Sequence, residues 1–330
     1  MTIIDDDANR DANFKRAELL EEQGNLSDAL KVFLSIDDNR DQLILTRIGR
    51  LLYKLEQWSD AESKLLAATR VDPDFWLARF YLGLVYRAQG ELEKAEAELF
   101  SASKFDDSAS TLNVLGVVQL ELGLTKVAQE SFRKAIKLDA DSEESMYNLA
   151  TTLGTDASSE AIELFERAIE LDPHYGVAHR EFGWYLRQLQ RFPEAEYHLR
   201  RSIELDSADA WSRIYLGNLL WLVGDFEGAE SSFKEAIKIW PAEAVGYWCL
   251  AYFYERQGRN QEAEQLYQRA IEVDPHDAQA NWRMGNYLKG IGDLTRARNY
   301  LKESIELDPT DKRVLEALAQ FDEGSTLGSS

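Results

Sequence analysis

The side chains able to do acid–base, nucleophilic or metal chemistry in this 330-residue sequence include four histidines and one cysteine. The histidines His174, His179, His198 and His276 show no His-x-x-x-His spacing, so no metal site is expected. Cys249 has no basic or histidine neighbour adjacent in the sequence, which favours a packed thiol over a nucleophile. Phosphate-binding glycine loops, Gly-x-Ser-x-Gly elbows and kinase signatures are absent. We therefore expect no enzyme, no cofactor and no metal.

Tryptophan, in contrast, is concentrated in one part of the chain. Of the eight tryptophans, five fall in four segments that begin at residues 176, 210, 244 and 278. They are Trp184, Trp211, Trp221, Trp248 and Trp282. Tryptophan and arginine are enriched at binding hot spots because they offer a large contact area and hydrogen-bond donors with few conformational freedoms to lose. This clustering indicates molecular recognition rather than catalysis.

The segments that carry these tryptophans belong to a repeat of about 34 residues, seen most clearly from Ala210 to Glu243. Counting Ala210 as position 1, a small residue stands at position 8 of nine successive copies. These are Ala17, Gly49, Gly83, Gly116, Ala150, Gly183, Gly217, Ala251 and Gly285. Position 20 is alanine in every copy, at Ala29, Ala61, Ala95, Ala128, Ala161, Ala195, Ala229, Ala263 and Ala297. Two antiparallel helices packed about 8 to 10 Å apart need such small side chains where their axes come closest.

Glycine and proline mark the predicted helix boundaries. Glycine at position 15 favours a left-handed cap at the end of a first helix, as at Gly24, Gly90, Gly123, Gly224, Gly258 and Gly292. Proline at position 32 ends the second helix at Pro73, Pro173, Pro241, Pro275 and Pro309. Each copy is therefore predicted to be a helical hairpin. Large residues at positions 7, 11 and 24, such as Tyr86 and Phe165, should pack between hairpins.

This pattern is similar to that of the tetratricopeptide repeat, with Leu216, Gly217, Ala229, Phe233 and Pro241 at the family's positions. The resemblance implies an all-α fold, a right-handed superhelical solenoid of antiparallel helix pairs. We expect nine such repeats over residues 10–309 and a carboxy-terminal capping helix over 310–322. The ends, 1–9 and 323–330, are expected to be disordered.

The fifth copy is irregular, because only eleven residues separate Ala150 from Ala161 where twelve are usual. Residues 154–159 are also unusually small and polar, so the first helix of this repeat should end early. Two interpretations are open. The stack tolerates a loop deletion here, or the chain bends between repeats 1 to 4 and repeats 6 to 9.

In the tetratricopeptide family the first helix of each hairpin lines a concave groove, and positions 2, 5, 9, 12 and 13 point into it. The resemblance therefore implies a partner-binding groove on repeats 6 to 9. Its candidate residues are Arg180, Trp184, Arg187, Asn218, Trp221, Trp248, Tyr252, Trp282, Asn286 and Lys289. The periodicity agrees, since these positions form one stripe at helical spacing. Some aromatic residues could instead pack against the next repeat, as we expect for Tyr247 and Tyr254.

One binding mode of the family does not fit the residues present. Heat-shock co-chaperones hold a terminal carboxylate with lysine at position 5 and asparagine at position 9 of one repeat, and asparagine at position 6 of the next. Asn218 has Ile214 where the lysine is needed and Cys249 where the second asparagine belongs. We therefore expect no such carboxylate clamp.

The charge balance limits the partners that the protein can bind. With 37 Lys and Arg against 59 Asp and Glu, the net charge is −22, which repels nucleic-acid phosphates and anionic membrane surfaces. No apolar run approaches the roughly 18 residues of a membrane span, and Met1 to Arg10 lacks the apolar core of a signal peptide. A single cysteine favours a reducing compartment. We expect a cytoplasmic protein with no nucleic-acid or membrane partner.

Two functions are compatible with the sequence. The first is a non-catalytic scaffold or adaptor for protein–protein interaction that binds a peptide or a partner helix in its concave groove. The second is a regulatory or assembly subunit that wraps and controls a larger enzyme complex. A groove receptor should lose binding on one groove substitution, whereas a wrapping subunit should tolerate single changes across a large interface. The sequence does not predict the oligomeric state.

Overall fold

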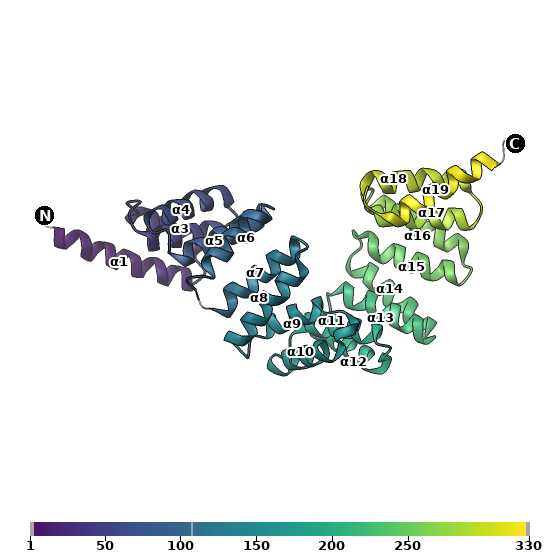
Figure 1. Ribbon diagram of the computed structural model, residues 1–330, viewed down its shortest axis with the longest axis horizontal. Coiled ribbons are helices and arrows are strands. Elements are labelled where there is room, and N and C mark those ends of the chain that lie inside the picture. The colour runs from purple at the N-terminus through teal and green to yellow at the C-terminus, as the bar shows by residue number, and fades with distance from the viewer. Residues whose placement is uncertain (1–2, 107, 328–330) are drawn as a thin grey trace. The chain divides into compact units, whose positions relative to one another are not determined.

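The computed structural model describes residues 3–106 and 108–327, with side chains over 9–106 and 108–319. Within these ranges the chain is helical and has no strand. It divides into two compact units, Met1–Asp172 and Pro173–Ser330. The expected all-α fold of antiparallel helix pairs is confirmed (Figure 1). None of the described helices is long and apolar enough to cross a membrane.

Helices of the first unit pack in consecutive pairs, and the two members of each pair contact each other along their length (Figure 1). The pairs are α1 (Ile3–Glu22) with α2 (Leu26–Ile36), α3 (Gln42–Lys54) with α4 (Trp58–Val71), α5 (Trp76–Ala88) with α6 (Leu92–Ala102), α7 (Ala109–Glu121) with α8 (Thr125–Leu138), and α9 (Glu143–Thr152) with α10 (Ser158–Leu171). A 3-10 turn, η1 (Thr155–Ala157), joins the last pair.

The second unit repeats the same arrangement and ends in one additional helix. Its pairs are α11 (Gly176–Gln188) with α12 (Phe192–Leu205), α13 (Ala210–Val223) with α14 (Phe226–Ile239), α15 (Ala244–Arg256) with α16 (Asn260–Val273), and α17 (Ala278–Gly290) with α18 (Leu294–Leu307). The additional helix, α19 (Lys312–Leu327), packs on α18.

Small residues lie where the two helices of a pair come closest. All nine alanines at position 20 are completely buried. A Cβ atom added to Gly217 at position 8 would lie only 2.8 Å from Cε1 of Phe233 on the opposite helix. The large residues expected between hairpins, including Tyr86 and Phe165, are buried as well. Close helix packing therefore explains both the small and the large positions of the repeat.

Position 15 adopts a left-handed conformation in every repeat except the irregular fifth, whether or not it is glycine. The six glycines expected to cap first helices have φ between 74° and 90°. Glu56 and Gln190 occupy the same position in repeats 2 and 6, with φ of 58° and 59°. The left-handed conformation costs an L-residue roughly 1–2 kcal/mol. Glu56 and Gln190 are therefore sites of local strain.

Repeat 5 differs from its neighbours in the way expected from its sequence. Its first helix, α9, has 10 residues and ends at Thr152, whereas α7 has 13. The 3-10 turn η1 follows before α10 begins. The boundary between the two units comes after α10, at Asp172. A bend between repeats 1 to 4 and 6 to 9 stays a prediction.

The chain ends are more helical than expected. Helix α1 begins at Ile3, so residues 3–9 are helical rather than disordered. The segment contains no proline or glycine that would end the helix before residue 22. Helix α19 continues to Leu327, past the expected end of the capping helix at 322. Of the tail expected to be disordered, only residues 328–330 lie outside the described part of the chain.

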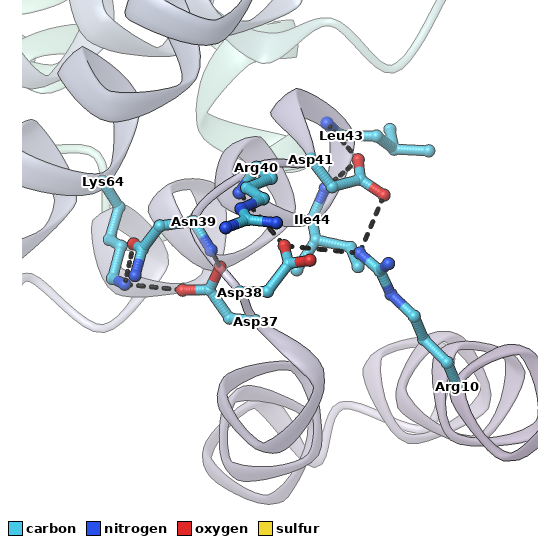
Figure 2. A network of polar contacts seen from close by, with 9 residues as sticks. All are labelled: Arg10, Asp37, Asp38, Asn39, Arg40, Asp41, Leu43, Ile44 and Lys64. Atoms are coloured by element: carbon cyan, nitrogen blue, oxygen red, sulfur yellow. Dashed lines mark hydrogen bonds and ion pairs between the residues drawn. The ribbon is translucent and has the colours of Figure 1, made fainter. Parts of the chain in front are cut away.

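Polar contacts hold the turn between α2 and α3, which has no proline (Figure 2). The carboxylate of Asp41 accepts hydrogen bonds from the backbone N–H groups of Leu43 and Ile44 at 2.9 and 3.2 Å, which caps α3. Arg10 on α1 donates to the same carboxylate at 3.2 Å. Lys64 on α4 donates to Asp37 at 2.6 Å. Side chains from α1 and α4 thus hold a turn that lacks the proline found at this position in five of the other repeats.

Candidate functional site

A pocket of about 600 Å³ lies on the first helices of the second unit. Its walls come from α11, α13, α15 and α17, the first helices of four consecutive pairs. Each of these helices contacts the next, so that equivalent positions of successive repeats lie side by side. The repeat itself therefore brings residues about 34 positions apart in the sequence to one surface.

Six of the ten residues expected to bind a partner line this pocket. They are Trp184, Arg187, Asn218, Trp221, Trp248 and Tyr252. Each is partly exposed in the free protein, as a contact residue must be. Their common face agrees with the stripe formed by positions 5, 9 and 12 of the first helices.

Seven further lining residues were not among the expected ones: Trp211, Ile214, Tyr215, Leu222, Val245, Cys249 and Arg283. Three of them, Tyr215, Cys249 and Arg283, occupy position 6 of their repeats. With about 3.6 residues per turn, position 6 is next to positions 2 and 9 on the helix surface. The recurrence of large or charged residues at position 6 was the signal that could have found them.

Arg180 was expected in the groove but is held by carboxylates outside it. Its Nη1 donates to Asp209 at 3.0 Å, and its Nε donates to Glu181 at 2.9 Å. Asp209 caps α13 by accepting a hydrogen bond from the backbone N–H of Trp211. The charge of Arg180 is therefore used to join α11 to the start of α13.

Trp282 was also expected in the groove, but it packs toward the last helix. Its ring lies against the cluster formed by Leu301 and Val314, and the guanidinium carbon of Arg313 is 4.4 Å from the ring centre. Val314 and Arg313 belong to α19, which covers the end of the stack. The remaining expected residues, Asn286 and Lys289, are partly exposed on α17 and do not line the pocket.

Six of the thirteen residues that line the pocket are aromatic, and their rings also join successive helices. The rings of Trp184 on α11 and Tyr215 on α13 stack with their centres 4.8 Å apart and their planes at 25°. Trp221 on α13 meets Tyr252 on α15 edge to face, with centres 5.5 Å apart. Such pairs contribute roughly 0.5–1.5 kcal/mol each beyond their buried area. The pocket wall is therefore also part of the packing between repeats.

Two arginines stand over these rings without a carboxylate partner. The guanidinium carbon of Arg187 lies 4.8 Å from the centre of the Trp184 ring. That of Arg283 lies 4.8 Å from the ring centres of both Trp248 and Tyr252. Within the described part of the chain, neither arginine forms an ion pair. Burial without a nearby acid lowers the pKa of Arg187.

Three donor atoms of lining side chains have no acceptor within the described part of the chain. Nε of Arg187, Nε of Arg283 and Nε1 of Trp248 are buried, and none donates to another group of the described chain. The side-chain amide of Asn218, in the same wall, likewise makes no hydrogen bond to a described residue. The wall can therefore accept a ligand that brings several acceptor atoms.

Cys249 lines the pocket as a packed thiol. It is 7 % exposed, and burial raises its pKa to about 12, so that it stays protonated at neutral pH. Among the residues whose positions are described, no group of three or more His, Cys, Asp and Glu side chains is arranged to hold a metal ion.

Models of the tetratricopeptide repeat match residues 46–110, 109–142, 157–210, 180–244 and 243–310. The chain belongs to the tetratricopeptide repeat family. Its repeats make it a scaffold for protein–protein interaction, in agreement with the expectation from the sequence.

One curated relative is the UDP-N-acetylglucosamine–peptide N-acetylglucosaminyltransferase of Giardia intestinalis, which is 30% identical over 151 residues. That stretch covers 44% of this tetratricopeptide repeat chain and 10% of the transferase, so the chain spans about a tenth of that relative's length.

Two solved structures share the fold. The crystal structure of the APC/C hetero-tetramer Cut9–Hcn1 has a TM-score of 0.57 at 17% identity, covering 94% of this chain and 62% of that chain. PilF of Pseudomonas aeruginosa has a TM-score of 0.50 at 20% identity, covering 64% of this chain and 97% of that chain. At these identities the similarity shows the fold alone.

Proposed function

We propose that the second unit binds a segment of a partner protein, either a peptide or a helix, in the pocket of α11, α13, α15 and α17. In this proposal the protein is a non-catalytic scaffold or adaptor. The observation that carries it is the convergence of six tryptophan and tyrosine side chains with two arginines in one pocket. Tryptophan, tyrosine and arginine dominate binding hot spots in protein interfaces.

The chemistry of the pocket supports binding rather than catalysis. Among the described residues that line it there is no His, Asp, Glu or Lys to act as a general acid or base. Cys249, the one potential nucleophile in the wall, stays protonated because burial raises its pKa to about 12. The similarity to a glycosyltransferase covers only 10% of that enzyme.

The overall charge supports a protein partner. A net charge of −22 repels nucleic-acid phosphates over distances of about 10 Å at moderate salt. The single cysteine is buried and favours a reducing, cytoplasmic setting for this partner.

The alternative is a regulatory or assembly subunit that wraps a larger enzyme complex. One observation favours it: over 94% of its length the chain is similar in fold to a chain of the APC/C hetero-tetramer Cut9–Hcn1. The two proposals differ in the size of the interface that they require. Binding in one pocket concentrates the binding energy in a few side chains, whereas wrapping distributes it over many repeats.

The test is to identify proteins that co-purify with the full chain and to measure the affinity of the purified partner for pocket variants. We expect Trp221→Ala and Trp248→Ala each to weaken binding by about 2 kcal/mol, roughly 30-fold. Trp58→Ala is the matched control, because Trp58 is an exposed tryptophan of the first unit, outside the pocket. It should leave the affinity unchanged.

Trp248 also packs against the buried Tyr247 and Ala280, so its removal is expected to lower the melting temperature. Asn218→Ala separates the two effects, because the Asn218 amide lines the pocket without a bond to a described residue. This variant should weaken binding and leave the melting temperature unchanged. Wild-type affinity in all three pocket variants would contradict pocket binding and favour the wrapping subunit.

A further inference from the structure

We propose that the pocket selects an acidic segment, in which an Asp or Glu side chain from within the partner's chain lies next to a large apolar side chain. This inference rests on the proposed function and specifies the partner's chemistry. The carboxylate would pair with Arg187 or Arg283, and the apolar side chain would lie on the rings between them.

The charge of the pocket is opposite to that of the whole protein. The chain has 22 more acidic than basic residues, yet the pocket lining contains two guanidinium groups and, among the described residues, no carboxylate. Several other arginines of the second unit pair with carboxylates of the protein. Arg180 pairs with Asp209, and Arg259 pairs with Glu230 at 2.9 Å. Arg187 and Arg283 are therefore the basic groups that the pocket lining offers to a ligand.

The unpaired hydrogen-bonding atoms of the pocket point to the same kind of ligand. Nε of Arg187, Nε of Arg283 and Nε1 of Trp248 are all donors. A carboxylate offers about four lone-pair sites, and a peptide backbone adds carbonyl oxygens. An acceptor-rich acidic segment therefore matches the donor character of these lining side chains.

The aromatic rings do not make this a site for a cationic ligand. A lysine or methylated amine would bind over a ring face, but guanidinium groups already stand over three of the six lining rings. Arg187 covers Trp184, and Arg283 covers Trp248 and Tyr252. A second cation would face their like charge.

The part of the pocket between the two arginines is apolar. Ile214 and Trp221 on α13 and Val245 on α15 line it, and so does Leu222, which is 55% exposed. Arg187 belongs to the first of the four lining helices and Arg283 to the last. A segment that crosses these helices can therefore place an aliphatic or aromatic side chain between two basic groups.

The experiment uses the full chain and three pools of short synthetic peptides, acetylated at the amino end and amidated at the carboxyl end. Each peptide has one central aliphatic or aromatic residue, flanked by Asp or Glu in the first pool, Asn or Gln in the second and Lys in the third. Binding is followed by tryptophan fluorescence, since four tryptophans line the pocket. We expect the acidic pool to bind at least tenfold more tightly than the amide pool, and the lysine pool to bind most weakly.

Charge substitutions then locate the selectivity. Arg187→Gln and Arg283→Gln should each lower the affinity for the acidic pool by about tenfold and leave the affinity for the amide pool unchanged. Arg269→Gln is the matched control, because it removes the same charge from an exposed position of α16 that pairs with Glu272. Arg269→Gln should change the affinity for neither pool.

Failure of the acidic pool to bind, or to bind better than the amide pool, would overturn the inference. Arg269→Gln and Arg187→Gln lowering the affinity for the acidic pool equally would also overturn it. Tight binding of peptides that carry only a free terminal carboxylate would overturn it too, by assigning the site to chain ends. If the amide pool binds equally well and Trp248→Ala weakens it, pocket binding stands while acidic selectivity fails.

Discussion

The guanidinium carbon of Arg187 lies 4.8 Å from the centre of the Trp184 ring, and in the described part of the chain no carboxylate pairs with this arginine. Arg180, on the same helix, donates to Asp209 and Glu181 instead. One arginine of α11 therefore serves the packing of the fold, while the other is held at the surface of a pocket without a protein partner. The two should respond differently to removal of their charge.

Replacing Arg187 by glutamine should change the free energy of unfolding by less than about 0.5 kcal/mol, since a desolvated charge is lost together with its ring contact. Arg180→Gln should cost roughly 1–3 kcal/mol, because it removes the charged partner of the half-buried carboxylate of Asp209. Urea unfolding of the two variants measures both values. Equal costs would show that Arg187 stabilises the fold as Arg180 does.

The strained cap of repeat 6 predicts a stabilising substitution. Gln190 has φ of 59°, and its replacement by glycine relieves roughly 1–2 kcal/mol of strain, reduced by about 0.5–1 kcal/mol of chain entropy. Gln190→Gly should therefore raise the free energy of unfolding by about 0.5 kcal/mol. Gly258→Gln, at the same position of repeat 8 with φ of 74°, should lower it by about as much. Thermal unfolding checks the pair, and changes of the same sign would rule out backbone strain as the cause.

Much of the fold could be predicted because each repeat carries its own packing marks. Ala229 and Gly217 are small where two helices come closest, and Gly224 ends its helix in a left-handed cap. The roles of all three residues can be predicted from the repeat pattern alone. The helical ends were missed because residues 3–9 and 323–327 have no packing pattern of this kind, and their helices continue from neighbouring, well-packed turns.

The candidate site was predicted less completely, because its composition depends on contacts between repeats. Arg180 does not line the pocket, because it forms an ion pair with Asp209 of the next repeat, the residue that caps α13. Trp282 fails because α19 covers its face and places Arg313 over its ring. Arg283 was missed because it stands at position 6 rather than position 5. The pattern of positions along one helix does not show which side chains of the neighbouring helix contact it.

Two histidines of repeat 6 give a pH dependence to its stability. Nδ1 of His179 on α11 lies 2.9 Å from Nδ1 of His198 on α12. The ring centres of His198 and Phe182 are 4.5 Å apart. Burial and the proximity of His179 lower the pKa of His198 from 6.5 to about 4. The unfolded chain therefore takes up a proton before the folded chain does as the pH falls. The stability from this group is complete above about pH 6.5 and is lost as the pH falls toward 4.

With His198 partly exposed to solvent, we expect this loss to be on the order of 1–2 kcal/mol. Carboxylates titrate in the same range, so the measurement is the difference between the wild type and His198→Gln. The free energy of unfolding of each is determined from pH 7.5 to pH 4. The difference should narrow below pH 6.5, and a constant difference over this range would mean that His198 does not carry the effect.

The end of the stack provides a last prediction. Val314 on α19 is completely buried against Leu301 of α18, and its neighbour Leu315 is 49% exposed. Val314→Asp places an unpaired charge in this contact, which costs about 3 kcal/mol or more unless α19 leaves its site. Undocking of α19 would expose Leu301 and Trp282, the apolar face of the last repeat, to solvent. The variant should therefore melt at a lower temperature and aggregate on heating.

Leu315→Asp is the matched control, because it adds the same charge one residue away on the exposed side of α19. It should change the free energy of unfolding by no more than about 0.5 kcal/mol. Thermal melts with simultaneous light scattering compare the two variants. If α19 caps the stack, only Val314→Asp should scatter light at temperatures where the wild type stays clear. Indistinguishable melts and scattering for the two variants would show that the second unit is stable without α19 docked, and that the face holding Trp282 does not depend on it.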